Sequence, residues 1–223
     1  MGSPNVVFFD CDDCLYQNNW ATARKITDAI ASHVAKLGVS KEKAYELYKT
    51  HGTCLKGLIN EGIIDGESQV EEFLLAAHDI VYTDIEENAN LRRMILRIKP
   101  DIRKFVFTAS TKEHALRCLK HVNVADLFVG VIDTRVCKLD TKHAESSFRA
   151  AMSFADAHDP SKCLLIDDSV KNIERAKSMG WKTVLVGKVS RDTGEPITCD
   201  AADVHVECAE QLENEMPSLF IDL

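Results

Sequence analysis

An apolar segment at residues 6–9 is followed by two carboxylates that a single residue separates, Asp10 and Asp12. Side chains two residues apart in an extended chain point to the same side, so this pair can converge at the end of a strand. Buried carboxylates repel each other unless they share a cation or a proton. The spacing therefore predicts a divalent-metal site, at which one carboxylate attacks phosphorus and the other moves a proton.

A second apolar segment, residues 163–166, also ends in adjacent carboxylates, Asp167 and Asp168. Each acidic segment alone is compatible with a simple turn, in which Asp12, Asp13 or Asp168 only caps the helix that follows. Two such segments in one chain favour a shared metal site. There Asp168 would supply a further oxygen, and Asp167 would act through a bound water or orient a lysine.

Polar residues that could hold a phosphate follow another predicted strand, at Thr108, Ala109 and Ser110. A hydroxyl and free backbone amides at the start of a helix bind phosphate oxygens, although Thr108 or Ser110 could also be a simple helix cap. A cation is needed to offset phosphoryl charge, and the candidates are Lys138 and Lys142. Lys142 directly precedes a predicted helix, so helix register favours Lys142, unless both lysines lie on the solvated surface.

The elements expected around these residues alternate between strand and helix after Pro100. Strands are predicted at 104–108, 127–132, 163–167 and 183–186, and helices at 112–122, 144–155 and 170–179. This alternation predicts an α/β fold with a Rossmann-like parallel sheet flanked by helices, which binds ligands beyond the carboxyl ends of its strands.

Residues 17–96 have no convincing strand, and their apolar residues recur at helical spacing. The expected organisation is a catalytic core of residues 1–16 and 97–223, with an all-helical cap of residues 17–96 inserted after the first strand. A cap beside the paired carboxylates could exclude water and contact the part of a substrate that does not react.

The 223 residues carry a net charge of -8, which disfavours nucleic-acid polymers and anionic membranes as partners but leaves small anions possible. The sequence shows neither a basic and apolar leader nor a run of about 18 apolar residues. We therefore expect a cytoplasmic protein that does not span a membrane. The eight cysteines, including the pair Cys11-x-x-Cys14, are predicted to be core residues, because neither a disulfide framework nor a zinc-finger spacing is evident.

Four motifs in this order resemble those of the haloacid dehalogenase-like phosphohydrolases. They are Asp10-x-Asp12-x-Cys14-Leu15-Tyr16, Phe107-Thr108-Ala109-Ser110, a lysine before a helix, and Ile166-Asp167-Asp168-Ser169-x-Lys171-Asn172-Ile173-Glu174. More narrowly, the chain resembles the pyrimidine 5'-nucleotidases of fungi and plants. Residues 91–94, 114–119, 125–128, Gly52 and 56–58 extend that similarity over nearly the whole chain.

The resemblance implies a magnesium-dependent (Mg2+) phosphatase that forms an aspartyl-phosphate intermediate on a small phosphomonoester, with pyrimidine nucleoside 5'-monophosphates as expected substrates. Asp10 would be the nucleophile, and Asp12 would protonate the leaving oxygen and then activate water. Lys142 would neutralise charge in the transition state. The helical insertion would be the cap that selects the substrate.

The resemblance also implies the groups that bind metal and phosphate. The implied metal ligands are Asp10, Asp12 through its backbone carbonyl, Asp168 and Asp167, and the implied phosphate-binding residues are Thr108, Ala109 through its amide, and Lys142.

The chain departs from the family pattern at two places. Ala109 stands where the family usually has Asn, so we expect altered orientation of the phosphate with retained activity, because the backbone amide makes the contact. The family's lysine commonly lies between a cysteine and a proline, which favours Lys138, whereas the spacing to the next helix and to Asp167 favours Lys142. A short insertion before the helix would reconcile the two patterns.

Other functions are compatible with these motifs. The substrate could be a sugar phosphate, phosphoglycolate or a vitamin phosphate, the reaction could be a phosphoglucomutase-type transfer, or the chain could be a catalytically silent regulatory module. Carbon-halogen displacement is disfavoured, because it needs neither a metal nor the second carboxylate, Asp12. The sequence does not indicate the oligomeric state.

Overall fold

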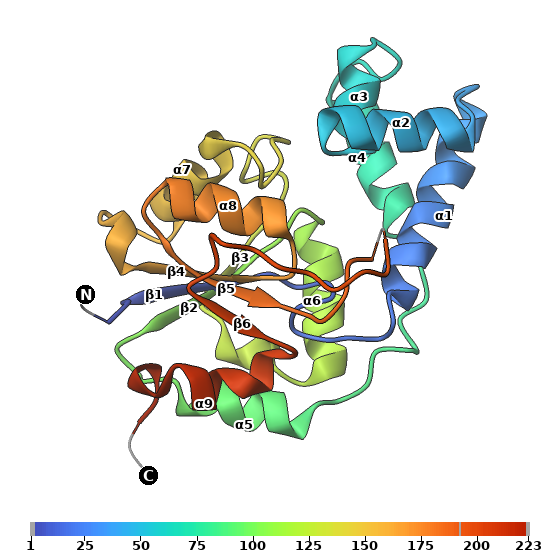
Figure 1. Cartoon of the computed structure of the whole chain (residues 1–223). Helices are drawn as coiled ribbons and strands as arrows, with labels where there is room; N and C mark the ends of the chain where they lie inside the picture. Colours follow the sequence, from blue (N-terminus) through green and yellow to red (C-terminus); the bar gives the residue numbers. More distant parts are fainter. Residues whose placement is uncertain (1–2, 192, 222–223) are drawn as a thin grey trace.

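The computed structural model describes residues 3–191 and 193–221. Their strands form one sheet in the order β3-β2-β1-β4-β5-β6, and every neighbouring pair is parallel. The strands are β1 (Val6–Phe9), β2 (Arg103–Phe107), β3 (Gly130–Ile132), β4 (Cys163–Asp167), β5 (Lys182–Val186) and β6 (Val204–Val206). The Rossmann-like α/β architecture predicted from the sequence is confirmed (Figure 1).

Helices cover both faces of this sheet. The side chains of β1 alternate, so that Val6 and Phe8 pack with α7 (Glu145–Phe154) and α8 (Val170–Ser178) on one face. Val7 and Phe9 join a second cluster on the other face. The helices of that face are α5 (Ala89–Arg97), α6 (Lys112–Val122) and α9 (Leu212–Glu215). Both faces of the central strands are therefore buried, as expected of a parallel sheet.

Aromatic side chains fill the core between the sheet and α7. Phe148 packs edge-on against Trp181, with ring centroids 5.0 Å apart, and edge-on against Phe107 at 5.5 Å. Phe8 lies 4.7 Å from Trp181. Each of these side chains is almost completely buried. Their packing fixes α7, which begins three residues after Lys142.

Four helices lie between β1 and α5, to one side of the sheet and within the range predicted to be the cap (Figure 1). They are α1 (Ala21–Lys36), α2 (Lys41–His51), α3 (Cys54–Asn60) and α4 (Glu67–Ala77). Their apolar faces make a separate hydrophobic cluster that includes Val34, Leu47, Leu58 and Phe73. None of the described helices is both long and apolar enough to cross a membrane.

Helix α5 packs on the sheet, although the expected cap range of 17–96 includes most of it. Leu91, Met94 and Ile95 are buried in the same cluster as Val7 and Phe9. Their spacing predicts a helix with one buried face, but it does not say which surface covers that face. The division into domains stays a prediction, and this packing favours assigning residues 89–96 to the core.

Two further details differ from the sequence prediction. The strand expected at 127–132 begins only at Gly130, because a 3-10 turn, η1, occupies Ala125–Leu127. Strand β6 and helix α9 were not predicted, since a strand of three residues and a helix of four are too short for a periodic pattern. The other short 3-10 turns are η2 (Pro160–Lys162), η3 (Ala209–Gln211) and η4 (Pro217–Leu219).

The aromatic core gives a first prediction. Phe148→Ala should lower the free energy of unfolding by about 3–5 kcal/mol, because it leaves a cavity among fully buried rings. Phe154→Ala, in the same helix at a side chain 48% exposed, is the matched control and should cost about 1 kcal/mol or less. Urea unfolding followed by tryptophan fluorescence measures both, and similar losses would contradict the packing described.

Candidate active site

The candidate active site lies at the carboxyl edge of the sheet, where three neighbouring strands end. Strand β1 lies between β2 and β4, and Phe9 is aligned with Val106 on one side and Ile166 on the other. Asp10, Thr108 and Asp167 consequently reach the same edge from three separate parts of the chain. All three side chains are buried.

Lys142 is the cation at this edge. Its side chain is only 5% exposed, and its Nζ lies 2.6 Å from Asp10 Oδ1 and 2.7 Å from Asp167 Oδ2. Nζ also donates a hydrogen bond of 3.0 Å to the carbonyl of Phe107. Burial alone would lower the pKa of Lys142, but the two carboxylates outweigh it and raise the pKa above its usual range. Lys142 is therefore held as an ammonium ion.

Lys138, the other candidate lysine, lies in the turn before Lys142. Its side chain is exposed, and its backbone has a positive φ of 53°. The structure thus brings Lys142, and not Lys138, to Asp10.

Asp167 is fully engaged in hydrogen bonds. One carboxylate oxygen accepts from the amide of Ser169 and from Asn172 Nδ2, both at 2.9 Å. The other oxygen accepts from Lys142 and, at 3.1 Å, again from Asn172. Of the two roles expected for Asp167, this arrangement favours the one in which it orients Lys142.

Asp168 differs from Asp167 in its hydrogen bonding. Within residues 3–191 and 193–221, no hydrogen bond or ion pair reaches its half-buried carboxylate. Burial, followed by the charges of Asp10 and Asp167, raises its pKa well above the usual range. Burial also raises the pKa of Asp10 to about 7, although Lys142 opposes this.

One oxygen from each of Asp10, Asp167 and Asp168 lies within 4.8 Å of the others. The ammonium group of Lys142 contacts only two of these three carboxylates, so a further cation would relieve their repulsion. An all-oxygen donor set suits a hard divalent ion such as magnesium. The residues present therefore fit the metal expected from the sequence.

The phosphate-binding segment follows β2. Thr108 is buried, and its hydroxyl accepts a hydrogen bond of 3.0 Å from the amide of Ser110. Ala109 is exposed, and all three residues line the same cavity as Asp10 and Lys142. Thr108 and Ala109 thus lie where the sequence analysis expected phosphate contacts.

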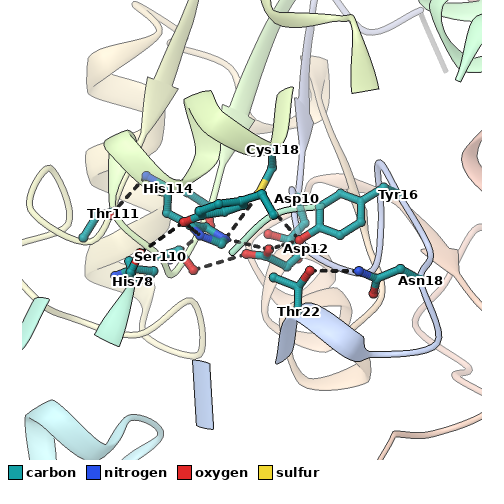
Figure 2. Close-up of polar contacts among 12 residues, drawn as sticks. Asp10, Asp12, Tyr16, Asn18, Thr22, His78, Ser110, Thr111, His114 and Cys118 are labelled. Carbon is teal, nitrogen blue, oxygen red and sulfur yellow. Dashed lines mark hydrogen bonds and ion pairs between the residues drawn. The ribbon is translucent and has the colours of Figure 1, made fainter. Parts of the chain in front are cut away.

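Asp12 also lines this cavity, but its carboxylate is not part of the acidic group around Asp10. Figure 2 shows the carboxylate of Asp12 between Tyr16 and His114. Tyr16 and His114 Nε2, the latter at 2.8 Å, both contact Oδ1, and Ser110 Oγ donates to Oδ2 at 3.2 Å. The expected convergence of the two carboxylates is therefore incomplete, because Asp12 contacts these three groups and Asp10 contacts Lys142.

His114 forms an ion pair with Asp12. Tyr82 donates its hydroxyl proton to the carbonyl of His78 and lies 2.9 Å from His114 Nδ1, so both ring nitrogens of His114 act as donors. Burial by itself would lower the pKa of His114, but Asp12 raises it to about 12. Burial would likewise raise the pKa of Asp12, but the imidazolium holds it well below its usual range.

The sequence analysis assigned no role to His114 or Tyr16, which entered only as parts of the family resemblance. His114 lies 102 residues from Asp12 along the chain. A buried histidine in a helix is ordinarily a core residue, so only its spatial partner distinguishes it. Tyr16 lies only four residues after Asp12, so it is the partner of Asp12 that a local sequence pattern could have indicated.

The cap completes a cavity of about 920 Å³ over these residues. Residues 48–53 from α2 and the turn after it line the cavity, as does Trp20. Gly52 has a φ of +84°, and a Cβ atom there would lie 2.8 Å from Thr141 Cγ2, so this close approach of cap and core requires glycine. Ion pairs between Lys56 and Asp140, and between Arg135 and Glu71, also join cap to core.

Comparison with known proteins agrees with this architecture. The model of the haloacid dehalogenase-like hydrolase family matches residues 4–180, which include the whole site. The chain belongs to the haloacid dehalogenase-like hydrolases. The family match confirms the resemblance found in the sequence motifs and makes the protein a hydrolase.

A curated relative is Phosphate metabolism protein 8 of Saccharomyces cerevisiae, which is 30% identical over 204 residues. The match covers 81% of this chain, and the chain spans only about 60% of that protein's length. Among solved structures, β-phosphoglucomutase from Clostridium difficile has a TM-score of 0.66 at 20% identity, covering 96% of each chain. The hydrolase YfnB from Bacillus subtilis bound to magnesium has a TM-score of 0.60 at 11% identity, covering 97% of this chain and 100% of that chain. At these identities, the two structures show a shared fold.

The position of Lys142 gives a second prediction. Lys142→Ala should reduce kcat for the phosphomonoester hydrolysis expected from the sequence at least about 100-fold, because it removes a buried charge beside Asp10, the expected nucleophile. Lys138→Ala is the matched control and should change kcat by no more than about twofold, since it alters an exposed residue. Steady-state phosphate release measures both. A larger loss for Lys138→Ala would reverse the assignment.

Proposed function

We propose that this hydrolase is a magnesium-dependent phosphatase that acts on small phosphomonoesters through an aspartyl-phosphate intermediate, with pyrimidine nucleoside 5'-monophosphates as its substrates. The observation that supports it most directly is the buried ammonium of Lys142 between Asp10 and Asp167, with the carboxylate of Asp168 beside them. This arrangement suits a phosphoryl group, whose negative charge needs cations on more than one side.

In the first step, a carboxylate oxygen of Asp10 attacks phosphorus while the bond from phosphorus to the leaving oxygen breaks. Asp12 passes the Nε2 proton of the His114 imidazolium to that oxygen, and Lys142 offsets charge on the phosphoryl group. Thr108 and the amide of Ala109 hold the phosphoryl oxygens. In the second step, Asp12 removes a proton from water as the water attacks the phosphoaspartate, which releases phosphate and restores Asp10.

Asp10, the backbone carbonyl of Asp12 and Asp168 would hold magnesium, with Asp167 contributing through a water or only by orienting Lys142. When bound, the ion would stabilise charge on the phosphoryl oxygens and on the attacking carboxylate. The magnesium in the similarly folded YfnB supports this choice of ion. The acidic group of this chain supplies the hard oxygen ligands that such an ion prefers.

The cap surface of the cavity provides the contacts that would select a substrate. Tyr48 and Trp20 line it with aromatic rings, and His51 and Lys49 add polar groups. Aromatic rings can stack on a nucleobase. Together with the sequence resemblance to pyrimidine 5'-nucleotidases, this lining supports a nucleotide substrate.

A substrate panel tests the proposal and is our third prediction. Phosphate release is measured with magnesium from the four common nucleoside 5'-monophosphates, a sugar phosphate, phosphoglycolate and a vitamin phosphate. The pyrimidine nucleotides should have the highest kcat/KM. Asp10→Asn should abolish turnover without loss of folding, because an amide of similar shape is not a nucleophile. Chelation of the metal should stop the reaction of the parent.

The result can contradict the proposal in distinct ways. If a sugar phosphate or another metabolite ranks first, the pyrimidine specificity is wrong but the chemistry stands. Phosphorylation of the enzyme without net hydrolysis would indicate a phosphoglucomutase-type transfer. If no substrate releases phosphate, or if Asp10→Asn stays active, the proposed mechanism is wrong.

The ion pair of Asp12 with His114 gives a fourth prediction. His114→Leu should lower kcat/KM for a nucleoside monophosphate by about 100-fold, because Asp12 loses the group that orients it for proton transfer. p-Nitrophenyl phosphate has a leaving group that needs no protonation, so its kcat/KM should fall about tenfold or less. His114→Gln, which keeps a hydrogen-bond donor, should recover part of the loss. Equal losses for both substrates would mean that His114 has only a structural role.

A further inference from the structure

A second group of ligating atoms lies behind the catalytic carboxylates. Ligand atoms of Cys11, Asp12 and Cys118 all lie within 4.8 Å of one another. His114 joins them, with Nε2 2.8 Å from Asp12 Oδ1 and 3.5 Å from Cys118 Sγ. Figure 2 shows Cys118 beside His114 and close to Asp12.

The fold presents these atoms from two separate segments. His114 and Cys118 are four residues apart in α6 and so lie on one face of the helix, one turn from each other. Cys11 and Asp12 follow β1 directly. The Cys-x-x-Cys pair of the sequence is not the functional unit here, because Cys14 instead donates its thiol hydrogen to the carbonyl of Ile166.

The donor set is chemically different from that of the magnesium site. Two thiols, one imidazole and one carboxylate are the ligands of tetrahedral zinc, whereas magnesium prefers oxygen alone. With zinc-ligand bonds of roughly 2.0–2.3 Å, neighbouring ligand atoms of a tetrahedron lie roughly 3.3–3.8 Å apart. The 3.5 Å between His114 and Cys118 fits this range, and the 2.8 Å between His114 and Asp12 would lengthen on binding. The ligand atoms of Cys11, Asp12 and Cys118, which lie within 4.8 Å of one another, would move closer together.

Surrounding groups would support a bound ion. Tyr82 lies 2.9 Å from the Nδ1 of His114, which fixes the ring with Nε2 directed at the cluster, as partners of metal-bound histidines usually do. Tyr16 contacts both Asp12 and Cys118. Although Cys11, His114 and Cys118 are fully buried, the side chain of Asp12 is 23% exposed and lines the large cavity, which provides a route for an ion.

We propose that Cys11, Asp12, His114 and Cys118 form a binding site for zinc or a similar thiophilic divalent cation, separate from the magnesium site. Binding displaces the two thiol protons and one imidazole proton to solvent. The ion engages the carboxylate of Asp12, which then can neither protonate a leaving group nor activate water. Zinc consequently inhibits the enzyme while magnesium stays bound, and this inhibitory consequence rests on the proposed function.

Cobalt is the probe for the site, because a tetrahedral thiolate site gives it thiolate-to-metal charge-transfer absorption and intense visible bands. The full chain is kept reduced with a phosphine, saturated with magnesium and titrated with cobalt. The parent should develop both absorptions at one ion per chain, and zinc should remove them. The titration does not depend on catalytic activity.

Matched variants assign the absorption to the proposed ligands. Cys118→Ala and Cys11→Val should each abolish the charge-transfer bands, whereas Cys54→Ala, at a buried cysteine of the cap, should keep them. Asp168→Asn should also keep them, because it alters only the magnesium site. Thermal unfolding verifies that each variant is folded. The proposal is overturned if the parent shows no charge-transfer absorption, or if the absorption survives in both folded Cys11 and Cys118 variants.

Inhibition is measured separately, in excess magnesium. Zinc should inhibit the parent, and Cys118→Ala should need a zinc concentration at least about tenfold higher for the same inhibition, because a ligand is missing. Equal inhibition of the parent and of Cys118→Ala would mean that zinc inhibits by binding at the magnesium site. That result would contradict the proposed inhibition through Asp12. If no hydrolysis is found for the parent while the cobalt bands appear, the proposed function fails and the metal site stands.

Discussion

The buried ammonium group of Lys142 is the interaction on which the site depends. Burying an isolated charge costs several kcal/mol, so the charged form of Lys142 is stable here only because two carboxylates and a carbonyl surround it. Its partners come from the end of β1, the end of β4 and the end of β2. A parallel sheet whose adjacent strands end together provides such a meeting point, and the aromatic core around Phe148 anchors the helix that follows Lys142.

The segment after β1 divides the site into two chemical halves. Asp10 faces Lys142, Asp167 and Asp168, an environment of oxygen atoms and one ammonium group. Asp12, two residues later, faces the imidazolium of His114 and two thiols. Two carboxylates of one short motif therefore lie in different surroundings. The carboxylate of Asp12 thereby lies between the oxygen ligands around Asp10 and the two thiols, which is the arrangement on which the proposed zinc site rests.

Most of the fold could be predicted from the sequence, and the elements that could not be predicted have physical reasons. The four helices of the cap and the alternation after Pro100 follow from periodic apolar patterns. Helix α5 shows the limit of such patterns, since its spacing specifies a buried face but not the surface that covers it. The short elements β6 and α9 could not be predicted, because three or four residues are too few to show an apolar periodicity. Their conformation depends on the elements that they pack against.

The sequence by itself determined the chemical groups of the site and the family, because carboxylates at strand ends and a lysine before a helix are local features. It identified Asp10, Thr108, Asp167 and Asp168, and it favoured Lys142 over Lys138 by register alone. Only the tertiary structure joined His114 and Cys118 to Asp12, since contacts across about one hundred residues depend on helix packing against the sheet. It also decided that both carboxylate oxygens of Asp167 accept hydrogen bonds, whereas none from the described part of the chain reaches Asp168, because hydrogen bonding depends on the folded surroundings.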